Sequence, residues 1–269
     1  MNLMILDLGC GTAKEEGAIG VDRICLPDVD VIADLDEYPY PFADNTFDVI
    51  YLNDVIEHLP DTMATMEDVH RISRPNARIF IRVVNWNSHY TAMDPTHVKS
   101  FTENTFDFFG QREVRSYYTH ARFDVVNVDL QYNALAEKRF RSKRLMKFLS
   151  FYLCNVLEGL NFELRAIKEN TTTGGCLESD PSSLFNILRC PQCAAGGSRE
   201  QGADPGRLDL FQGCWLVCQE ESCGLKYPTY HGVAIMLRQE RERWHGVPLM
   251  DLPVPLPEDL VRRFRPTTI

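Results

Sequence analysis

The chain has 269 residues, of which 44% are hydrophobic and 25% are charged, as is typical of a globular protein with a sizeable core. This composition excludes a disordered, collagen-like or coiled-coil chain. No run approaches the roughly 18–20 uninterrupted apolar residues that cross a bilayer. The N-terminal apolar run reaches Asp7 too early for a signal peptide. We therefore expect a soluble, cytoplasmic protein with no membrane span.

The net charge of −10 is unevenly distributed along the chain. Residues 1–68 hold 2 basic and 16 acidic side chains, whereas residues 69–175 hold 16 basic and 10 acidic ones. An acidic protein attracts nucleic acid weakly, because phosphate attraction supplies the sequence-independent part of that affinity. The charge therefore does not favour nucleic acid as a partner, although the basic middle third leaves a localised anionic acceptor open.

The first 170 residues alternate short apolar runs with helical patterns. This alternation predicts an α/β fold with a Rossmann-like, doubly wound and mainly parallel sheet. The dipeptide Arg74-Pro75 ends the first long helix, and the last two strands could add an antiparallel edge. We expect strands at 3–8, 18–21, 29–33, 47–52, 78–84, 122–130 and 162–168, and helices at 61–73 and 138–157.

Three segments follow from the pattern. Residues 1–173 form the α/β domain, and a polar, glycine-bearing stretch at 169–181 reads as a linker. Residues 184–237 are rich in cysteine and are expected to form a small zinc-ribbon-like α+β domain. Residues 238–269 contain five prolines, and we expect this tail to be extended and irregularly packed.

A glycine turn, Asp7-Leu-Gly9-Cys-Gly11, follows the first apolar strand. Such a turn brings backbone N–H groups close to a ligand, although a tight strand connection alone can also require glycine. Asp7 would repel a pyrophosphate but suits a cation, and Asp22 ends the next strand, where a carboxylate can bind both ribose hydroxyls. Lys14 occupies the position of the third glycine in a dinucleotide-binding motif, so the sequence favours NAD less as the ligand. A positively charged nucleoside fits better.

These motifs resemble the class I S-adenosylmethionine-dependent methyltransferases. ILDLGCGT is similar to their first motif and GVD to their second, while FDVIYLNDVIEHL and HRISRPNARIFI resemble later strands and helices. The likeness covers about residues 3–170. The resemblance implies Asp7, Gly9, Cys10 and Gly11 at the methionine moiety, Asp22 and Arg23 at the ribose, Asp34 and Leu35 at the adenine, and Asn53 on the sulfonium side.

The first crossover is shorter than in that family. Only ten residues, 12–21, separate the glycine turn from Asp22, where a full helix and a strand normally stand. We expect a stub that leaves the cofactor less covered or dependent on another segment. This short form resembles a branch often associated with surface-polysaccharide or natural-product clusters.

Two histidines are candidates for the chemistry. Methyl transfer from a sulfonium needs a base only if the acceptor is a poorly ionised hydroxyl or amine. His58 follows the fourth strand in Glu57-His58, and it either removes a proton or packs against the next helix. His97 lies in a later segment that could cover the acceptor, and it is either catalytic or an ordinary loop histidine.

Nine cysteines include five within residues 190–223. Cys190 and Cys193 form one pair, and Cys218 and Cys223 form a second, so four sulfurs can converge on a structural zinc ion. Four thiolates leave no open position for water. Cys214 could replace Cys218 or Cys223 in this set. An odd number of cysteines without an export signal argues against a disulfide framework.

The cysteine-rich segment resembles a second family. LRCPQC, LVC, CGLKYP and GVAIML are similar to the small zinc-binding activator subunit of methyltransferases that act on tRNA, rRNA and translation release factors. That likeness covers about residues 184–237. It implies a non-catalytic module that stabilises a methyltransferase by covering apolar surface and strand edges. With both halves on one chain, we expect the module to pack on the methyltransferase domain in cis.

The sequence as a whole predicts a methyltransferase that uses S-adenosylmethionine and carries a structural zinc module. The rival hypothesis is a non-catalytic protein that senses the cofactor or recruits a partner through a degenerate methyltransferase domain. An NAD-linked oxidoreductase is disfavoured by Lys14 and the short crossover. The acceptor is either a small molecule or saccharide, or a component of translation.

Overall fold

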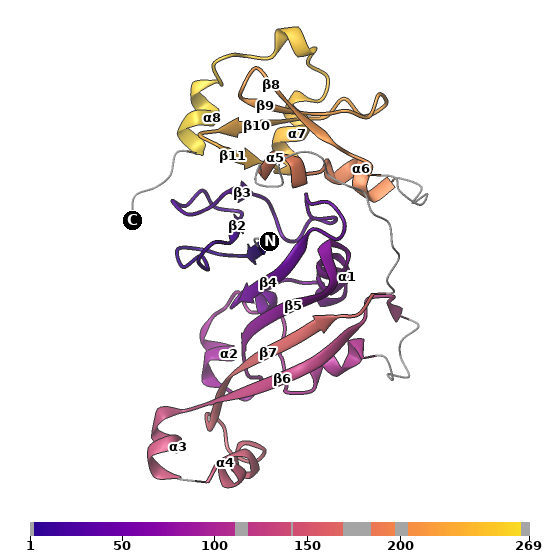
Figure 1. Cartoon of the computed structure of the whole chain (residues 1–269). Coiled ribbons are helices and arrows are strands. Elements are labelled where there is room, and N and C mark those ends of the chain that lie inside the picture. The colour runs from indigo at the N-terminus through magenta and orange to yellow at the C-terminus, as the bar shows by residue number, and fades with distance from the viewer. Residues whose placement is uncertain (1–2, 111–117, 141, 169–183, 197–203, 265–269) are drawn as a thin grey trace. The chain divides into compact units, whose positions relative to one another are not determined.

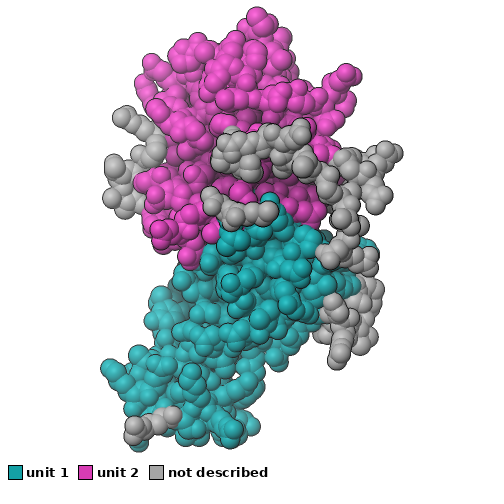
Figure 2. All heavy atoms as spheres, in the orientation of Figure 1, with its two compact units in different colours: residues 1–3, 47–168 teal, residues 4–46, 169–269 magenta. Residues whose placement is uncertain are grey.

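The computed structural model describes residues 3–110, 118–140, 142–168, 184–196 and 204–264. The chain forms two compact units, which Figure 2 shows in different colours, and Figure 1 labels the helices and strands. Unit 1 consists of residues 1–3 and 47–168, and unit 2 consists of residues 4–46 and 169–269. The first strands of the chain therefore group with its C-terminal third.

Unit 2 begins with three short parallel strands, β1 (Ile5–Leu8), β2 (Ile19–Asp22) and β3 (Val31–Ile32). In residues 4–46 the connections between them contain turns but no helix. The predicted stub crossover is therefore confirmed, and the connection from β2 to β3 is equally short. These strands receive no covering helix from their own part of the chain.

The cysteine-rich segment extends this sheet. Strand β11 pairs in parallel with β3, with Ala234 opposite Val31 and Ile235 opposite Ile32. From β11 the sheet continues through antiparallel partners, in the order β1-β2-β3-β11-β10-β9-β8 for unit 2. The elements of this segment are α5 (Leu184–Ile187), α6 (Pro191–Gly196), β8 (Leu208–Phe211), β9 (Trp215–Cys218), β10 (Lys226–Tyr230) and β11 (Val233–Ile235).

The C-terminal tail is not extended, so that prediction is wrong. It forms α7 (Arg238–Trp244), a 3-10 turn η4 (Leu249–Asp251) and α8 (Glu258–Arg263). The tail's prolines lie outside these helical spans: Pro248 precedes η4, and Pro257 occupies the N-cap position of α8. A proline just before a helix interrupts no helical hydrogen bond, so proline content did not prevent helix formation.

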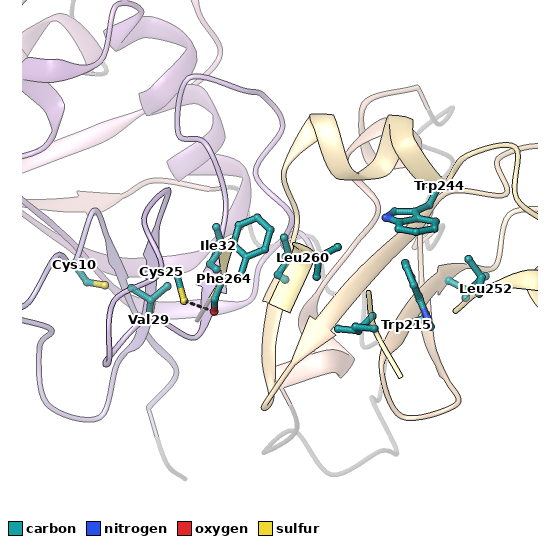
Figure 3. Packing of buried hydrophobic residues seen from close by; sticks show 12 residues of the cluster. Cys10, Cys25, Val29, Ile32, Trp215, Trp244, Leu252, Leu260 and Phe264 are labelled. Atoms are coloured by element: carbon teal, nitrogen blue, oxygen red, sulfur yellow. Dashed lines mark hydrogen bonds between the residues drawn. The ribbon is translucent and has the colours of Figure 1, made fainter. Parts of the chain in front are cut away.

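The tail packs on the uncovered first strands. Figure 3 shows Phe264 beside Ile32, and the Cys25 thiol donates to the Phe264 carbonyl at 3.0 Å. Trp215 and Trp244 meet edge to face, with ring centroids 5.0 Å apart. The tail therefore covers apolar surface that a crossover helix would otherwise cover. One buried cluster joins both parts: Cys10, Cys25, Val29, Ile32, Trp215, Val217, Ile235, Trp244, Leu252, Leu256, Leu260 and Phe264.

Unit 1 contains a four-stranded mixed sheet in the order β6-β7-β5-β4. Strands β4 and β5 run parallel through the crossover helix α1, whereas β7 is antiparallel to both β5 and β6. The predicted antiparallel edge is confirmed. The elements are β4 (Phe47–Asn53), η1 (Ile56–His58), α1 (Thr62–Ile72), β5 (Ser73–Val84), α2 (His89–Met93), η2 (Thr105–Phe109), β6 (Phe123–Tyr132), α3 (Ala134–Arg139), α4 (Lys143–Ser150) and β7 (Leu157–Ala166).

Helix α1 agrees with the sequence pattern. Asp61 caps its N-terminus by accepting from the Ala64 N–H at 3.0 Å. Its buried face includes Met66, Val69 and Ile72, at helical spacing, and the helix ends where β5 begins. None of the described helices is long and apolar enough to cross a membrane.

Two other expectations need correction. The sheets are mixed rather than mainly parallel, because β7 and the strands β8 to β10 each add antiparallel pairs. The single helix expected at 138–157 is two short helices, α3 and α4. Asn133 and Ser142 each accept a backbone N–H and so start a new helix. Helix α3 buries no residue and α4 buries only Met146, so packing does not hold them as one continuous helix.

Candidate functional site

The predicted glycine turn follows β1 in unit 2. Gly9 and Gly11 have φ angles of 73° and 52°, a region that glycine adopts without the steric cost of a Cβ. The N–H groups of Gly9 and Cys10 donate to the Val21 carbonyl at 2.8 and 3.1 Å, which fastens the turn to β2. A Cβ on Gly11 would meet no atom within 4 Å. The turn is therefore open to a ligand on that side.

Two carboxylates hold this turn in place. Asp7 is 1% exposed, and its Oδ2 accepts from the Glu15 N–H at 2.9 Å. Asp22 is half-buried at the end of β2, where Oδ2 accepts from the Gly11 N–H at 3.1 Å and Oδ1 from the Ile24 N–H at 2.9 Å. A carboxylate offers about four acceptor positions, so both Asp22 oxygens keep capacity for ribose hydroxyls.

The remaining predicted cofactor residues of unit 2 surround the ends of β2 and β3. Leu35 is buried and Asp34 is half-buried just after β3, with Asp34 Oδ1 accepting from the Asp36 N–H at 3.0 Å. Arg23 is exposed. An apolar side chain beside a carboxylate suits one face and one edge of a purine. The predicted set therefore shares one end of the three strands.

Cys10 and Lys14 do not supply reactive groups here. Burial, together with the nearby charges of Asp7 and Asp22, raises the pKa of the Cys10 thiol to about 12, so the thiol stays neutral. The Lys14 ammonium pairs with Asp30 at 2.9 Å, and the same Asp30 oxygen accepts from the Gly20 N–H at 2.8 Å. Lys14 is thereby engaged in tying the stub crossover to β3.

The four predicted metal ligands form a second group in unit 2. One sulfur from each of Cys190, Cys193, Cys218 and Cys223 lies within 4.8 Å of the others. The sulfurs of Cys190 and Cys223 are 3.7 Å apart, and those of Cys193 and Cys218 are 3.6 Å apart. A tetrahedron with metal–sulfur bonds of about 2.3 Å has edges of about 3.8 Å, whereas a disulfide needs about 2.0 Å. The spacing therefore fits a zinc ion better than disulfides.

The charges in this cluster point the same way. The hydrogen bond from Cys218, whose effect exceeds that of burial, lowers the pKa of the Cys190 thiol to about 5, with a smaller contribution from Tyr227. Burial, the hydrogen bond with Cys223 and the Cys190 charge raise the pKa of Cys193 to about 12. The hydrogen bond with Cys190 and then burial raise the pKa of Cys218. One thiolate forms readily, but further thiolates need a cation to offset their repulsion.

Cys214 lies outside the sulfur cluster and packs against the hydrophobic cluster of Figure 3. The choice of Cys218 and Cys223 over Cys214 thus agrees with the geometry.

Several supports of the cysteine cluster were not identified from the sequence. Arg189 is buried next to Cys190, and its guanidinium binds both oxygens of Asp204 at 2.6 and 2.7 Å. The Cys190 N–H donates to the Gly206 carbonyl at 2.7 Å, and a Cβ on Gly206 would lie 2.9 Å from the Cys190 carbonyl. The stretch between the two cysteine pairs holds five glycines, and nothing in the sequence singled out Gly206.

A third group lies in unit 1, after β4. The two predicted histidines, His58 and His97, have ring centroids 4.7 Å apart. Glu57 is 1% exposed, and neither of its carboxylate oxygens accepts a hydrogen bond from the described residues. Burial raises the pKa of this carboxyl group. The predicted Asn53 is half-buried at the end of β4. The sequence pointed to His58 but gave no sign that its neighbour Glu57 is buried.

Comparisons with solved structures give similarity at low identity. YcgJ from Bacillus subtilis is 14% identical, over 62% of this chain and 93% of that one, with a TM-score of 0.40. A SAM-dependent methyltransferase from Archaeoglobus fulgidus is 20% identical, over 61% and 86%, with a TM-score of 0.41. A chain in the complex of the Haloferax volcanii Trm112 methyltransferase activator and a methyltransferase is 14% identical, over 62% and 83%, with a TM-score of 0.40.

No match was found among curated proteins. Residues 3–167 match the family described as a methyltransferase domain. This match spans well over half of the chain and contains the glycine turn, Asp22 and the Glu57-His58 pair. The chain belongs to the methyltransferase domain family.

Proposed function

We propose that this chain transfers a methyl group from S-adenosylmethionine to an acceptor. The carrying observation is the open glycine turn bounded by Asp7 and Asp22, in a chain of the methyltransferase domain family. The acids beside the turn suit a cationic amino acid and a ribose. The N–H groups of residues 9–11 donate to Val21 and Asp22, and Lys14 pairs with Asp30, so these donors are not free for a pyrophosphate.

The proposed donor site uses the residues of the first strands. Asp7 would face the methionine ammonium, and the backbone at residues 9–11 would line the methionine moiety. Asp22 would bind the ribose hydroxyls, with Arg23 at its outer side, while Asp34 and Leu35 would flank the adenine. When bound, S-adenosylmethionine supplies an electrophilic methyl group. The protein's own contribution is then to orient donor and acceptor and to exclude water.

In this proposal, side chains of unit 1 remove the proton of the acceptor. His58 and His97 are the groups that the sequence assigned to the acceptor side, whereas Asn53 was assigned to the sulfonium side of the cofactor. A hydroxyl or amine acceptor must lose a proton, and a neutral imidazole can accept one. The acceptor would be a small molecule or saccharide, or a component of translation.

Calorimetry on the full-length protein tests the donor site. S-adenosylmethionine or its demethylated product should bind, and NAD should not. Asp22→Ala should weaken binding by about 1–3 kcal/mol, because a hydroxyl pair loses its charged acceptor. Asp28→Asn, at an exposed position in the next loop, is the matched control and should bind normally. Equal affinity in the two variants would remove Asp22 from the site.

Turnover separates an enzyme from a binding protein. Mass spectrometry of a reaction with a panel of hydroxylated and nucleic-acid acceptors should detect methylated product. Tight cofactor binding without any product would instead favour the non-catalytic sensor. His58→Asn should lower turnover about 10²–10⁴-fold if His58 removes the acceptor's proton, with cofactor affinity unchanged.

The cysteine-rich segment acts in this proposal as a zinc-stabilised activator in cis. The pairing of β11 with β3 supports it, because an exposed strand edge is otherwise unpaired and prone to aggregation. Truncation after Thr173 removes every segment that pairs with β3 on that side. The fragment 1–173 should be insoluble or unstable, and addition of residues 184–269 in trans should restore it. A soluble, fully active 1–173 fragment would refute the activator role.

A further inference from the structure

We propose that Glu57, His58 and His97 bind a divalent transition-metal ion, separate from the thiolate site. Glu57 and His58 come from η1 after β4, and His97 comes from the segment after α2. One ligand atom from each of the three lies within 4.8 Å of the other two. Two imidazoles and one carboxylate are a ligand set that holds iron, cobalt or zinc while leaving coordination positions open.

The hydrogen bonds fix which nitrogen of His58 is free. The Thr96 hydroxyl donates its single hydrogen to Asp94 Oδ1 at 2.6 Å. Thr96 Oγ1 also lies 2.8 Å from His58 Nδ1, so at that contact it is His58 Nδ1 that carries the hydrogen and donates. The other ring nitrogen, Nε2, then holds a lone pair. The Asp94–Thr96–His58 series is the kind of outer support that orients a ligating histidine.

His97 is held in the same tautomer. Its Nδ1 lies 3.2 Å from the Thr91 carbonyl oxygen, which can only accept, so Nδ1 donates and Nε2 keeps its lone pair. The backbone fastens this histidine to the other two ligands, because the Val98 and Lys99 N–H groups donate to the Glu57 carbonyl at 2.9 and 3.1 Å. In their neutral forms both imidazoles therefore keep Nε2 unprotonated, as a metal requires, and Asp94 Oδ2, 4.0 Å from His97 Nε2, lies beyond hydrogen-bond distance of it.

Glu57 gives the independent sign of a missing partner. Its side chain is buried, yet neither oxygen receives a hydrogen bond from the described residues. An unpaired buried carboxylate is costly, and a bound cation removes that cost. If the position of Glu57 served packing alone, an apolar side chain would fill it at lower cost. A buried carboxylate at this position therefore points to a bound cation.

The metal site itself is independent of the proposed methyl transfer. Its role in binding the acceptor rests on that proposed function. The open coordination positions would take oxygen atoms of a hydroxyl-bearing acceptor, which favours a saccharide or ribose over an apolar one. In that case His58 would hold the metal instead of acting as the free base considered above, and the bound metal would supply Lewis-acid activation of the acceptor hydroxyl.

Cobalt(II) is the probe for a test on the full-length protein. Equilibrium dialysis measures the ions bound per chain, and the visible spectrum separates the sites, because only the cysteine site gives sulfur-to-metal charge-transfer bands. We expect one Co²⁺ without those bands. Glu57→Gln and His97→Gln should abolish it, whereas the exposed controls Glu137→Gln and His120→Asn should retain it.

A variant that keeps all three ligands distinguishes loss of the metal site from misfolding of the protein. Thr96→Val removes only the support of His58 and should weaken Co²⁺ binding about 10–100-fold, and Thr96→Ser should restore it. Absence of a sulfur-free Co²⁺ site in the wild type, or equal binding by Thr96→Val and His97→Gln proteins, would overturn the assignment. Calorimetry with S-adenosylmethionine on the same samples reports the donor site separately, so failure of one proposal is distinguishable from failure of the other.

Discussion

Leu260→Ala tests whether the C-terminal helix α8 is an integral part of unit 2. Leu260 is fully buried, and it belongs to the cluster that joins the tail to Cys10, Cys25, Val29 and Ile32 (Figure 3). If the tail serves as the cover of these strands, a cavity at Leu260 must destabilise the strands as well as the tail.

The expected magnitude follows from burial. Replacing a fully buried leucine with alanine costs about 2–5 kcal/mol, from the lost transfer of its methyl groups and from the cavity left behind. Domain stabilities are about 5–15 kcal/mol, so the variant should unfold at a clearly lower urea concentration. Met250, in the same tail, is 83% exposed. Met250→Ala should change the free energy of unfolding by no more than about 0.5 kcal/mol.

Tryptophan fluorescence provides the assay. Trp215 and Trp244 lie in this cluster, whereas Trp86 is exposed in unit 1. Urea titration followed by fluorescence should therefore report unit 2. Hydrogen exchange at the Met236 N–H, which donates to the Ile32 carbonyl at 2.8 Å, should accelerate in parallel. A loss below about 1 kcal/mol, or unchanged exchange at Met236, would refute the covering role of the tail.

Three further predictions follow from other contacts. Elemental analysis should find one zinc ion per chain, bound at the four cysteines. The Cys193→Ser protein should lose the zinc ion, and its C-terminal segment should no longer fold. The Cys214→Ser protein should keep the zinc ion and the fold. Gly20→Ala should cost about 1–3 kcal/mol, because the new Cβ would lie 2.9 Å from a backbone oxygen, while Gly246→Ala, with nothing within 4 Å, should be neutral; equal melting temperatures would contradict this. Burial lowers the pKa of His70 in the folded chain, so as the pH falls the unfolded chain takes up this proton at a higher pH than the folded chain does. The stability contributed by His70 should therefore be full above the ordinary histidine pKa and be lost as the pH drops through the pKa of the folded chain. Urea titrations at pH 7 and pH 5 should show that His70→Asn reduces this dependence on pH.

The sequence by itself determined the features that depend on neighbouring residues. The Asp61 cap and the apolar spacing of Met66 and Val69 specify α1, because capping and periodicity act within one or two turns. The ten residues between the glycine turn and Asp22 were too few for a helix and a strand, so the stub crossover was predictable by length alone. The cysteine spacing likewise favoured the four sulfurs that lie together, with Cys214 left as an alternative.

Hydrophobic burial decided how distant segments pack together, and the sequence does not specify which segments will meet. An apolar side chain in the tail signals that it will be buried, but burial is non-directional and does not name its partner. The Cys25 and Phe264 contact joins residues 239 positions apart, and no local pattern encodes it. The prolines suggested an irregular tail, whereas packing against Ile32 selected helix α8.

The histidine group shows the same division. The sequence placed His58 after a strand and His97 in a later segment, and both were candidates for their chemistry alone. Only the tertiary structure brings the two rings within 4.7 Å and buries Glu57 beside them. Whether a carboxylate is solvated or needs a cation depends on what surrounds it in space, which is a property of the folded chain rather than of its residue order.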